Sequence, residues 1–304
     1  MRVFVAGASG AIGEPLIAEL VKRGHSVTGM TTSETRAKVL EGQGASAAIV
    51  DAFDPVLVEA TLRRLKAEVV IDELTSLPKE QSEMPKYAAG DRKLRIEGGR
   101  NLLRAAIATG VRRYIQQSSG FFLKAAEGSL ADESSPLDVN ASPGVAASAR
   151  TYVELEARLF GSNAIQGVAL RYGFFYGPKT WYYPGNSAAN MVMRQQAPVV
   201  GKGQGVSSFV HINDAAAATV AALTAEGGVY NVVDDHPLPQ NVWLPAFASF
   251  VGASPPPHMG EAEARATAGE DAVYYATRLS GASNVKAKRA LGWKPRQLEW
   301  LQGK

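Results

Sequence analysis

A tyrosine on a predicted helix is the first residue of this chain with an obvious chemical use. In the stretch SARTYVELEA, Ser148, Tyr152 and Glu156 are four residues apart, so a helix places their side chains in one line. A phenol has a pKa of about 10, and a carboxylate one turn away raises it further. We expect Tyr152 to be a poor base and a competent proton donor, with a purely packing aromatic side chain as the alternative.

Three glycines near the start of the chain form a second group with a chemical use. They follow the strand-like RVFVA and precede the helical LIAELVKRG. The first glycine permits a tight turn, the second lets a phosphate approach the backbone, and the third lets helix pack on strand. Free N–H groups at the helix start then bind a diphosphate. The pattern predicts a dinucleotide site made by Gly7, Ser9, Gly10, Ala11, Ile12 and Gly13.

The residues after the second predicted strand indicate which dinucleotide binds. NAD sites usually have an acid at this strand end, whereas NADP sites have cations or hydroxyls there. After SVTGM the chain has Thr32, Ser33 and Arg36, and the nearest acid is Glu34. We therefore expect NADP, with NAD as the alternative because Arg36 could simply face solvent.

Composition narrows the class of protein. A chain of 304 residues with 46% hydrophobic and 20% charged residues fits one large α/β domain with a smaller lobe. The net charge of +3 is scattered, which argues against a nucleic-acid site. Without cysteine, and with four histidines at no ligand spacing, we expect no metal site. The start of the chain lacks signal-peptide features, and no apolar run reaches about 18 residues, so we expect a cytoplasmic protein that does not enter a membrane.

Short apolar runs alternate with helical patterns over the first two thirds of the chain. This alternation predicts an α/β fold with a doubly wound parallel sheet of the Rossmann type. We expect residues 1–172, with additions from 205–234, to form the dinucleotide-binding domain, and residues 173–204 and 235–304 to form a small C-terminal substrate lobe. The predicted strands cover residues 3–6, 26–30, 46–50, 69–71, 114–117 and 167–171.

The spacing G-x-x-G-x-x-G and several later stretches resemble the extended and atypical branch of the short-chain dehydrogenase/reductase superfamily, which includes NAD-dependent epimerase/dehydratase proteins. The resemblance covers nearly the whole chain. Its stretches are VDAFD, RIEGGRNLLRAA, VRRYIQQSSG, LRYGFFYGP, FVHINDAA and VKAKRALGWKP.

The resemblance implies roles for individual residues. Ser119 matches the superfamily's catalytic Ser or Thr, which hydrogen-bonds the substrate oxygen. His211 and Asp214 match a motif that braces the substrate lobe. The remaining implied cofactor contacts are Asp51 and Ala52 beside the adenine, Leu74 under the nicotinamide ribose, Ser118, and Tyr172, Gly173 and Phe174 at the nicotinamide half.

Two departures from the superfamily stand out. Where relatives have a small apolar strand end, this chain has Asp72 and Glu73, which we expect to be helix caps or solvated loop charges. The alternative is that an acid near the cofactor selects the substrate.

The second departure is the missing lysine of the superfamily's Tyr-x-x-x-Lys motif. Either Tyr152 is the catalytic tyrosine and Glu156 replaces the lysine, or Glu156 is a later family glutamate. In the second case Tyr152 takes the lysine position and Ser148 the tyrosine position. The distance to Arg171 is 171 − 152 = 19 residues from Tyr152 and 171 − 148 = 23 from Ser148. The longer spacing fits the superfamily better, which favours the second alignment. In both, no cation lies beside Tyr152 on this helix face.

Aromatic residues crowd the segments expected at the carboxyl edge of the sheet, where doubly wound folds bind ligands. We expect the substrate to contact Phe121, Tyr176, Trp181 and Tyr182, although some of these side chains would serve the core of the lobe. The prediction is an NADPH-dependent reductase of a carbonyl-bearing apolar or aromatic small molecule. The alternatives are a nucleotide-sugar epimerase or dehydratase with bound NAD, and a non-catalytic NADP-binding regulator. Relatives often dimerise through helices near residues 91–109 and 146–160, and a homodimer or a monomer fits the sequence equally.

Overall fold

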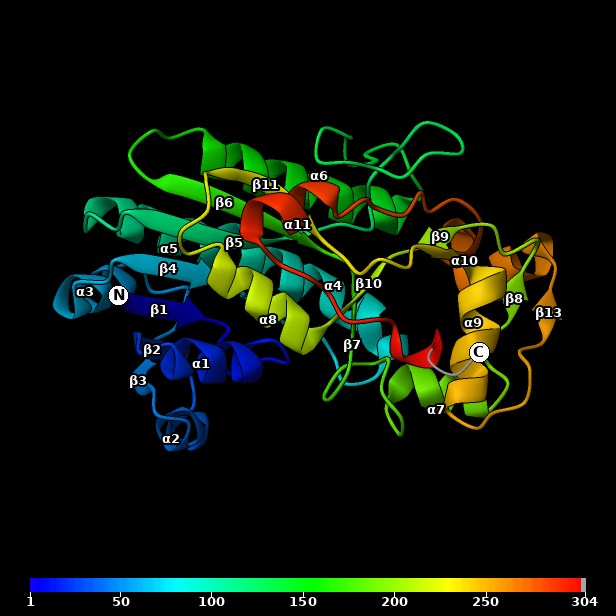
Figure 1. The fold of residues 1–304 in the computed structure, drawn as a ribbon, viewed down its shortest axis with the longest axis horizontal. Coiled ribbons are helices and arrows are strands. Elements are labelled where there is room, and N and C mark those ends of the chain that lie inside the picture. Colours follow the sequence, from blue (N-terminus) through cyan, green and yellow to red (C-terminus); the bar gives the residue numbers. More distant parts are fainter. Residues whose placement is uncertain (302–304) are drawn as a thin grey trace.

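The centre of the protein is a parallel sheet. A computed structural model describes residues 1–301, and its seven-stranded sheet has the order β11-β6-β5-β4-β1-β2-β3 (Figure 1). The expected doubly wound α/β fold is thereby confirmed, and each predicted strand corresponds to an observed one. The strands are β1 (Arg2–Ala6), β2 (Ser26–Thr31), β3 (Ser46–Ile49), β4 (Val69–Asp72), β5 (Arg113–Ser119), β6 (Gln166–Tyr172) and β11 (Gly228–Val232).

Helices cover both faces of this sheet, which is why most strand residues are buried, including most of the polar ones of β5. One layer contributes Leu16, Leu40 and Ala287 to the larger core cluster. The other contributes Leu62 and Leu102 to a second cluster on the opposite face. The first layer is α1 (Gly13–Lys22), α2 (Glu34–Gly42), α8 (Ile212–Ala221) and α11 (Val285–Leu291); the second is α3 (Pro55–Leu65), α5 (Gly99–Ala108) and α6 (Pro143–Phe160).

A run of short helices follows β4 and leads into the second layer. The π-helix η2 continues α4 into α5 and places the buried Arg95 at the carboxyl end of the sheet. Where Gly98 lies, a Cβ would be 2.9 Å from the Cβ of Ala52, so a glycine allows this helix to approach the end of β3. The elements of the run are η1 (Gln81–Glu83), α4 (Met84–Lys93) and η2 (Leu94–Gly98).

The small lobe lies beyond the carboxyl edge of the sheet (Figure 1). Its core is aromatic, and the Trp300 ring contacts both Phe209 and Phe247. Its elements are β7 (Phe174–Tyr176), α7 (Ser187–Met193), β8 (Val199–Val200), β9 (Val206–Ser207), β10 (Phe209–His211), β12 (Leu238–Pro239), α9 (Gln240–Phe250), β13 (His258–Met259), α10 (Glu261–Thr277) and η3 (Glu299–Leu301).

The packing differs from the predicted division of the chain in two places. Strand β10 falls within 205–234, which we assigned to the dinucleotide-binding domain, yet Phe209 belongs to the core cluster of the lobe. Helix α11 falls within the segment 235–304 that we assigned to the lobe, yet Ala287 and Trp293 belong to the core cluster of the sheet. Lys286 also donates to the backbone carbonyl of Val229 in β11 at 2.8 Å. The chain therefore returns to the sheet near its end. Within residues 1–301, no helix is both long and apolar enough to cross a membrane.

Candidate active site at the carboxyl edge of the sheet

In the glycine-rich turn between β1 and α1, neighbouring atoms leave no room for a side chain at two of the three glycines, while the third glycine is open to solvent. Gly7 has φ +78°, and a Cβ there would lie 2.2 Å from the carbonyl oxygen of Glu73. A Cβ on Gly13 would lie 2.2 Å from the carbonyl oxygen of Ala8. Gly10 is exposed, and the nearest atom to its Cβ position is 3.2 Å away. The first and third glycines are thus needed for packing, while the second leaves backbone surface open at a helix start, which fits a diphosphate.

The residues expected around the adenosine lie at two adjacent strand ends. Thr32 and Arg36 are exposed where β2 passes into α2, and the Ser33 N–H donates to Thr31 Oγ1 at 3.2 Å. Asp51, after β3, is exposed and accepts a hydrogen bond from the Phe53 N–H at 2.9 Å. Ala52 is buried. Strands β2 and β3 are direct neighbours in the sheet, so these two groups of residues lie side by side.

Glu156 belongs to a buried ion pair. Its Oε1 accepts from Arg171 Nε at 2.8 Å and its Oε2 accepts from an Arg171 terminal nitrogen at 2.7 Å. The Ser118 hydroxyl also donates to Glu156 Oε1 at 2.6 Å, so this hydroxyl is already engaged. Helix α6 is therefore fastened to β5 and β6 through Glu156. Glu156 thus has a structural use, and the choice between the two alignments stays a prediction from the sequence.

Tyr152 has a cation beside it, which the helix face alone did not show. The Arg95 guanidinium carbon lies 5.3 Å from the centre of the Tyr152 ring, and this ring is only 8% exposed. Burial raises the pKa of the Tyr152 hydroxyl, Arg95 lowers it, and Asp91 and Glu73 raise it. The expected rise in pKa is found, but the expected cause was wrong: burial is the main reason, and Glu156 is committed to Arg171.

Asp72 and Glu73 are buried, so the expectation of solvated or capping charges was wrong. Successive strand residues point to opposite faces. Asp72, 6% exposed, faces the α5 layer, where its carboxylate accepts from the Tyr114 hydroxyl at 2.6 Å. Glu73, 3% exposed, is hydrogen-bonded through Oε1 to the Tyr172 hydroxyl at 2.9 Å. Burial raises the pKa of both carboxyls, that of Glu73 to about 8.

Ser119 lies at the end of β5, opposite Tyr172 in the register of β5 and β6. Its side chain is buried, and its Oγ accepts a weak hydrogen bond from the Phe121 N–H at 3.4 Å. Tyr172 is buried as well. Its hydroxyl is bonded both to Glu73 and to Thr219 Oγ1, the latter at 2.6 Å. The side chain of Tyr172 is therefore part of the core, and its backbone carbonyl accepts from the Gly120 N–H at 2.8 Å.

An aromatic group lies where the sheet meets the small lobe. Phe121 stacks on Phe174 with ring centres 4.3 Å apart and meets Phe122 at 4.4 Å. Phe122 is 6.1 Å from the Tyr152 ring, and Tyr182 is 6.2 Å from Phe174. The structure thus brings two predicted substrate residues, Phe121 and Tyr182, to the same aromatic group.

The other two predicted substrate residues lie apart from this group. Tyr176 is fully buried, with its ring 5.0 Å from both His211 and Trp300, so it belongs to the core of the lobe. Trp181 donates from its indole nitrogen to the carbonyl of Pro78 at 3.1 Å and so connects the lobe to the segment after β4.

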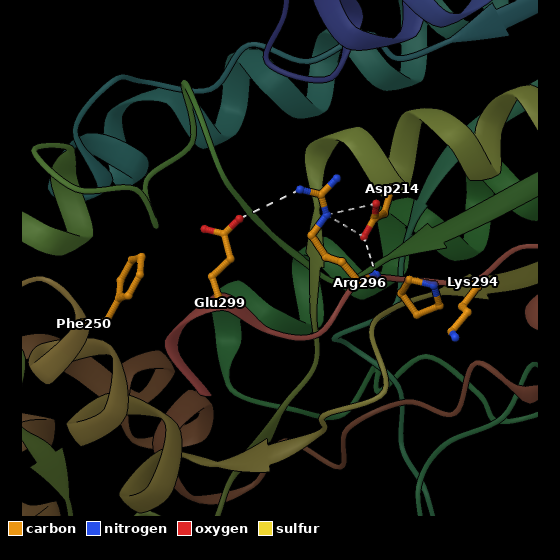
Figure 2. Close-up of a pocket in the computed structure, with 6 residues that line it drawn as sticks. Asp214, Phe250, Lys294, Arg296 and Glu299 are labelled. Carbon is orange, nitrogen blue, oxygen red and sulfur yellow. Dashed lines mark hydrogen bonds and ion pairs between the residues drawn. The ribbon is translucent and has the colours of Figure 1, made fainter. Parts of the chain in front are cut away.

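A surface hollow lies away from these residues, between α8, α9 and the end of the described chain (Figure 2). Arg296 donates from Nε to both Asp214 oxygens at 3.1 Å, and its N–H donates to Asp214 at 2.8 Å. Glu299 extends toward the same guanidinium at 4.0 Å. Asp214 thus braces the end of the chain against the sheet, in agreement with the role implied for its motif. Asp214, Arg296 and Glu299 are thus paired with one another, while Lys294 also lines the hollow.

Sequence reasoning missed Arg95 as a site residue. It precedes Tyr152 by 152 − 95 = 57 residues, and no local pattern joins the two positions. The only available signal was an arginine inside the apolar face of a helix, because a buried arginine requires nearby partners. Arg95 has such a partner in Asp91, whose carboxylate accepts from its Nε at 2.7 Å.

Comparison with known proteins now decides the family. Residues 3–233 match the model of the NAD dependent epimerase/dehydratase family. The chain belongs to this family. A 3-diazoavenalumate denitrifying reductase from Streptomyces sp is 39% identical over 305 residues, which cover 100% of this chain and 99% of that protein.

Solved structures share the fold of this chain. UDP-glucose 4-epimerase from Thermus thermophilus, in complex with NAD, is 25% identical with a TM-score of 0.73, covering 97% of this chain and 94% of that one. dTDP-glucose 4,6-dehydratase from Streptomyces venezuelae is 17% identical with a TM-score of 0.76, covering 98% and 93%. This family member is thus an oxidoreductase with a nicotinamide dinucleotide cofactor, and its full-length relative is a reductase.

Proposed function

We propose that this epimerase-family protein is an NADPH-dependent reductase of an apolar or aromatic small molecule. The observation that carries the proposal is the environment of Tyr152. Its side chain is only 8% exposed and burial raises its pKa, so it stays protonated at neutral pH. Glu156, the next polar side chain on this helix line, is engaged by Arg171. The site therefore offers protons and lacks an evident base.

This balance of acids and bases favours reduction over sugar chemistry. Oxidising a sugar hydroxyl requires a base that removes the hydroxyl proton as the hydride leaves. Reducing an acceptor requires a hydride and, for a carbonyl, a proton. A bound nicotinamide supplies the hydride. In this proposal Ser119 hydrogen-bonds the acceptor oxygen, while Tyr152 and Glu73 are both protonated groups from which the proton could come.

The aromatic group supports an apolar or aromatic substrate. Phe121 and Phe174 stack beside Tyr182, and rings of this kind favour a flat apolar partner. Diphosphate recognition would instead ask for several converging cations. Of the nearby cations, Lys179 pairs with Glu14 and Arg95 with Asp91.

The relative that matches this chain over its full length suggests a second type of hydride acceptor besides carbonyls. The name of that protein describes a reductase that removes nitrogen from a diazo acid. We propose an aryl diazonium group as an alternative acceptor for this chain. In that reaction the ring carbon gains a hydride, the carbon–nitrogen bond breaks, and dinitrogen leaves with the bonding electrons. No proton is consumed at the reacting carbon.

The choice of NADPH is proposed from the end of β2. Thr32, Ser33 and Arg36 supply hydroxyls and a cation where an NAD site usually has an acid, and Arg36 makes no ion pair with any residue of 1–301. Replacing Arg36 by Ala should weaken NADPH binding about tenfold, equivalent to about 1.4 kcal/mol, and leave NADH binding unchanged. Lys38→Ala, on the same helix, is the matched control in a fluorescence titration.

The decisive experiment follows cofactor oxidation with a panel of acceptors. We expect NADPH consumption with cinnamaldehyde or with a benzenediazonium salt, after subtraction of the enzyme-free rate, and no conversion of UDP-glucose or dTDP-glucose. Conversion of either sugar with tightly bound NAD would select the epimerase or dehydratase alternative. Binding of NADPH without turnover of any acceptor would select the non-catalytic regulator.

A further inference from the structure

Glu73 has a carboxyl oxygen that the described chain leaves without a partner. The residue lies just past β4, and its own carbonyl oxygen lies 2.2 Å from where a Cβ on Gly7 of the glycine-rich turn would be. Its Oε2 is fully buried and makes no hydrogen bond, while its Oε1 bonds the Tyr172 hydroxyl. A buried carboxylate with a free oxygen is costly, whereas a neutral carboxylic acid is much less so.

The hydrogen bonds that continue from Glu73 indicate where its proton is held. A chain of contacts runs from Glu73 Oε1 to the Tyr172 hydroxyl at 2.9 Å, to Thr219 Oγ1 at 2.6 Å, and to the Ala215 carbonyl at 2.7 Å. These are three hydrogen bonds, but the two hydroxyls supply only two protons. A proton on Glu73 lets all three bonds form at once, with the carboxyl donating to Tyr172.

The position of Glu73 relative to Ser119 follows from the strand register. Asp72 pairs with Gln116, so Glu73 continues opposite Gln117, and Ser119 lies two residues further along β5 on the same face. Tyr172 lies opposite Ser119 in the next strand. The Glu73–Tyr172 hydrogen bond therefore spans from the end of β4 to the end of β6, across the strand that ends in Ser119.

We propose that Glu73 is the proton donor of the reductase, delivering its carboxyl proton to the acceptor oxygen that Ser119 binds. This inference rests on the proposed function. The carbonyl carbon gains the hydride, its oxygen gains the Glu73 proton, and the carbon–oxygen double bond becomes the single bond of an alcohol. The nicotinamide is oxidised. Glu73 is left as a carboxylate and regains a proton from water once the product has left.

The charged groups around Glu73 are compatible with this role. Burial raises its pKa to about 8 and Asp72 also raises it, while Arg95 lowers it; a Tyr172 hydroxyl that donated to the ionised carboxylate would lower it as well. Tyr152, from α6, also interacts electrostatically with Glu73, and Asp91 offsets the charge of Arg95. Thr219 contributes only its hydroxyl from α8. A general acid is most effective when its pKa lies near the working pH.

Tyr152 is the weaker candidate for the same proton. Its pKa is raised above the ordinary phenol value, so it is the poorer acid of the two. Its ring lies under the Arg95 guanidinium, in the position that the alignment gives to the family's lysine. We assign Tyr152 to positioning.

The test compares two acceptors that differ in their need for a proton. In single turnovers with saturating NADPH, Glu73→Gln should reduce cinnamaldehyde at least 100-fold more slowly than wild type, since a general acid contributes about 100-fold or more. The same variant should keep its rate with the benzenediazonium salt, which needs hydride alone. The wild-type carbonyl rate should fall above pH 8, and this fall should be absent from the residual rate of Glu73→Gln.

Asp234→Asn is the matched control. Asp234 is another buried acid, whose pKa burial raises to about 7, but its Oδ1 accepts from the His236 N–H and it has no bond to Tyr172. Asp234→Asn should leave the rates with cinnamaldehyde and with the benzenediazonium salt unchanged. Tyr152→Phe should slow the carbonyl reaction far less than Glu73→Gln does. A cofactor-free readout is infrared difference spectroscopy at pH 7, where Glu73→Gln should remove the C=O band of a protonated carboxyl.

Several outcomes would overturn the inference. Equal losses with both acceptors would mean that Glu73 is only structural, and an unchanged carboxyl band would mean that it is ionised. If wild type used the diazonium probe but no carbonyl, Glu73 would have no proton to deliver, and the proposed reductase function would still stand. If wild type used no acceptor, the proposed function would fail, and this inference with it.

Discussion

At the scale of single residues, the three glycines of the β1–α1 turn differ in what they do. Gly13→Ala would place a Cβ 2.2 Å from the Ala8 carbonyl oxygen, so it should lower the free energy of unfolding by at least about 2 kcal/mol. Gly10→Ala meets its nearest atom at 3.2 Å and should stay within about 1 kcal/mol of wild type. It should still weaken NADPH binding at least tenfold, because the methyl group covers backbone expected to meet the diphosphate.

Urea denaturation and NADPH fluorescence titration on the two variants separate these effects. Full NADPH affinity in a folded Gly10→Ala protein would show that the diphosphate does not approach this turn. The sequence predicted this turn well, because its glycines lie within seven residues of one another and adjoin the strand and helix that define the motif.

Glu73 gives a stability prediction that needs no cofactor. Its pKa in the folded protein, about 8, lies above the ordinary value of 4.5, so the folded state binds more protons than the unfolded state between these values. Stability from this group is fully present below pH 4.5 and is lost as pH rises to 8. The loss is on the order of 5 kcal/mol at 1.36 kcal/mol per pKa unit. Glu73→Gln should therefore gain stability relative to wild type as pH rises from 5 to 8.

Asp234→Asn calibrates the same measurement. The pKa of Asp234 in the wild-type protein is about 7, against an ordinary value of 3.8. The stability of Asp234→Asn relative to wild type should therefore rise with pH only up to about pH 7, one pH unit earlier than for Glu73→Gln. Urea unfolding at half-unit pH steps would show both windows. If the difference in free energy of unfolding between Glu73→Gln and wild type did not change from pH 5 to 8, Glu73 would not be a buried neutral acid.

At the scale of elements, helix α6 is held to the sheet by one buried ion pair. Glu156 and Arg171 are 12% and 7% exposed, and the pair is bidentate. Glu156→Gln leaves the Arg171 charge without a counterion, and we expect a loss of about 3 to 5 kcal/mol in the free energy of unfolding. Glu154→Gln, on the same helix, breaks only the half-exposed pair with Arg100 at 3.5 Å and should cost less than about 1 kcal/mol.

Urea denaturation of both variants provides the comparison, and equal losses of free energy of unfolding would contradict a special role for Glu156.

Helix α6 also shows which features the sequence could and could not predict. The sequence predicted that α6 and β6 would form, because both have a regular pattern, but not that Glu156 and Arg171 would pair across them. The burial of Asp72 and Glu73 was missed, because it depends on α8 and on the run from α4 to α5, which fold back over the strand end.

At the scale of the whole molecule, the aromatic small lobe is attached to the sheet by contacts that cross between them. Trp181 donates to the Pro78 carbonyl at 3.1 Å, and the Ser187 hydroxyl accepts from the Gln81 N–H at 2.8 Å. These contacts join the lobe to the segment after β4, near Glu73. They unite chain segments about a hundred residues apart, so sequence predicted the existence of the lobe but not its attachment.

Trp181→Phe keeps an aromatic ring and removes the donor to Pro78, so the lobe should sit less firmly over the acceptor site. We expect the KM for cinnamaldehyde to rise about three- to tenfold, equivalent to about 0.7 to 1.4 kcal/mol, with NADPH affinity unchanged because the glycine turn is untouched. Tyr183→Phe is the matched control, since Tyr183 is the exposed neighbour in the same loop. Steady-state kinetics on both variants would decide. A Trp181→Phe protein that loses NADPH affinity while keeping its KM would show that this contact serves the cofactor rather than the substrate.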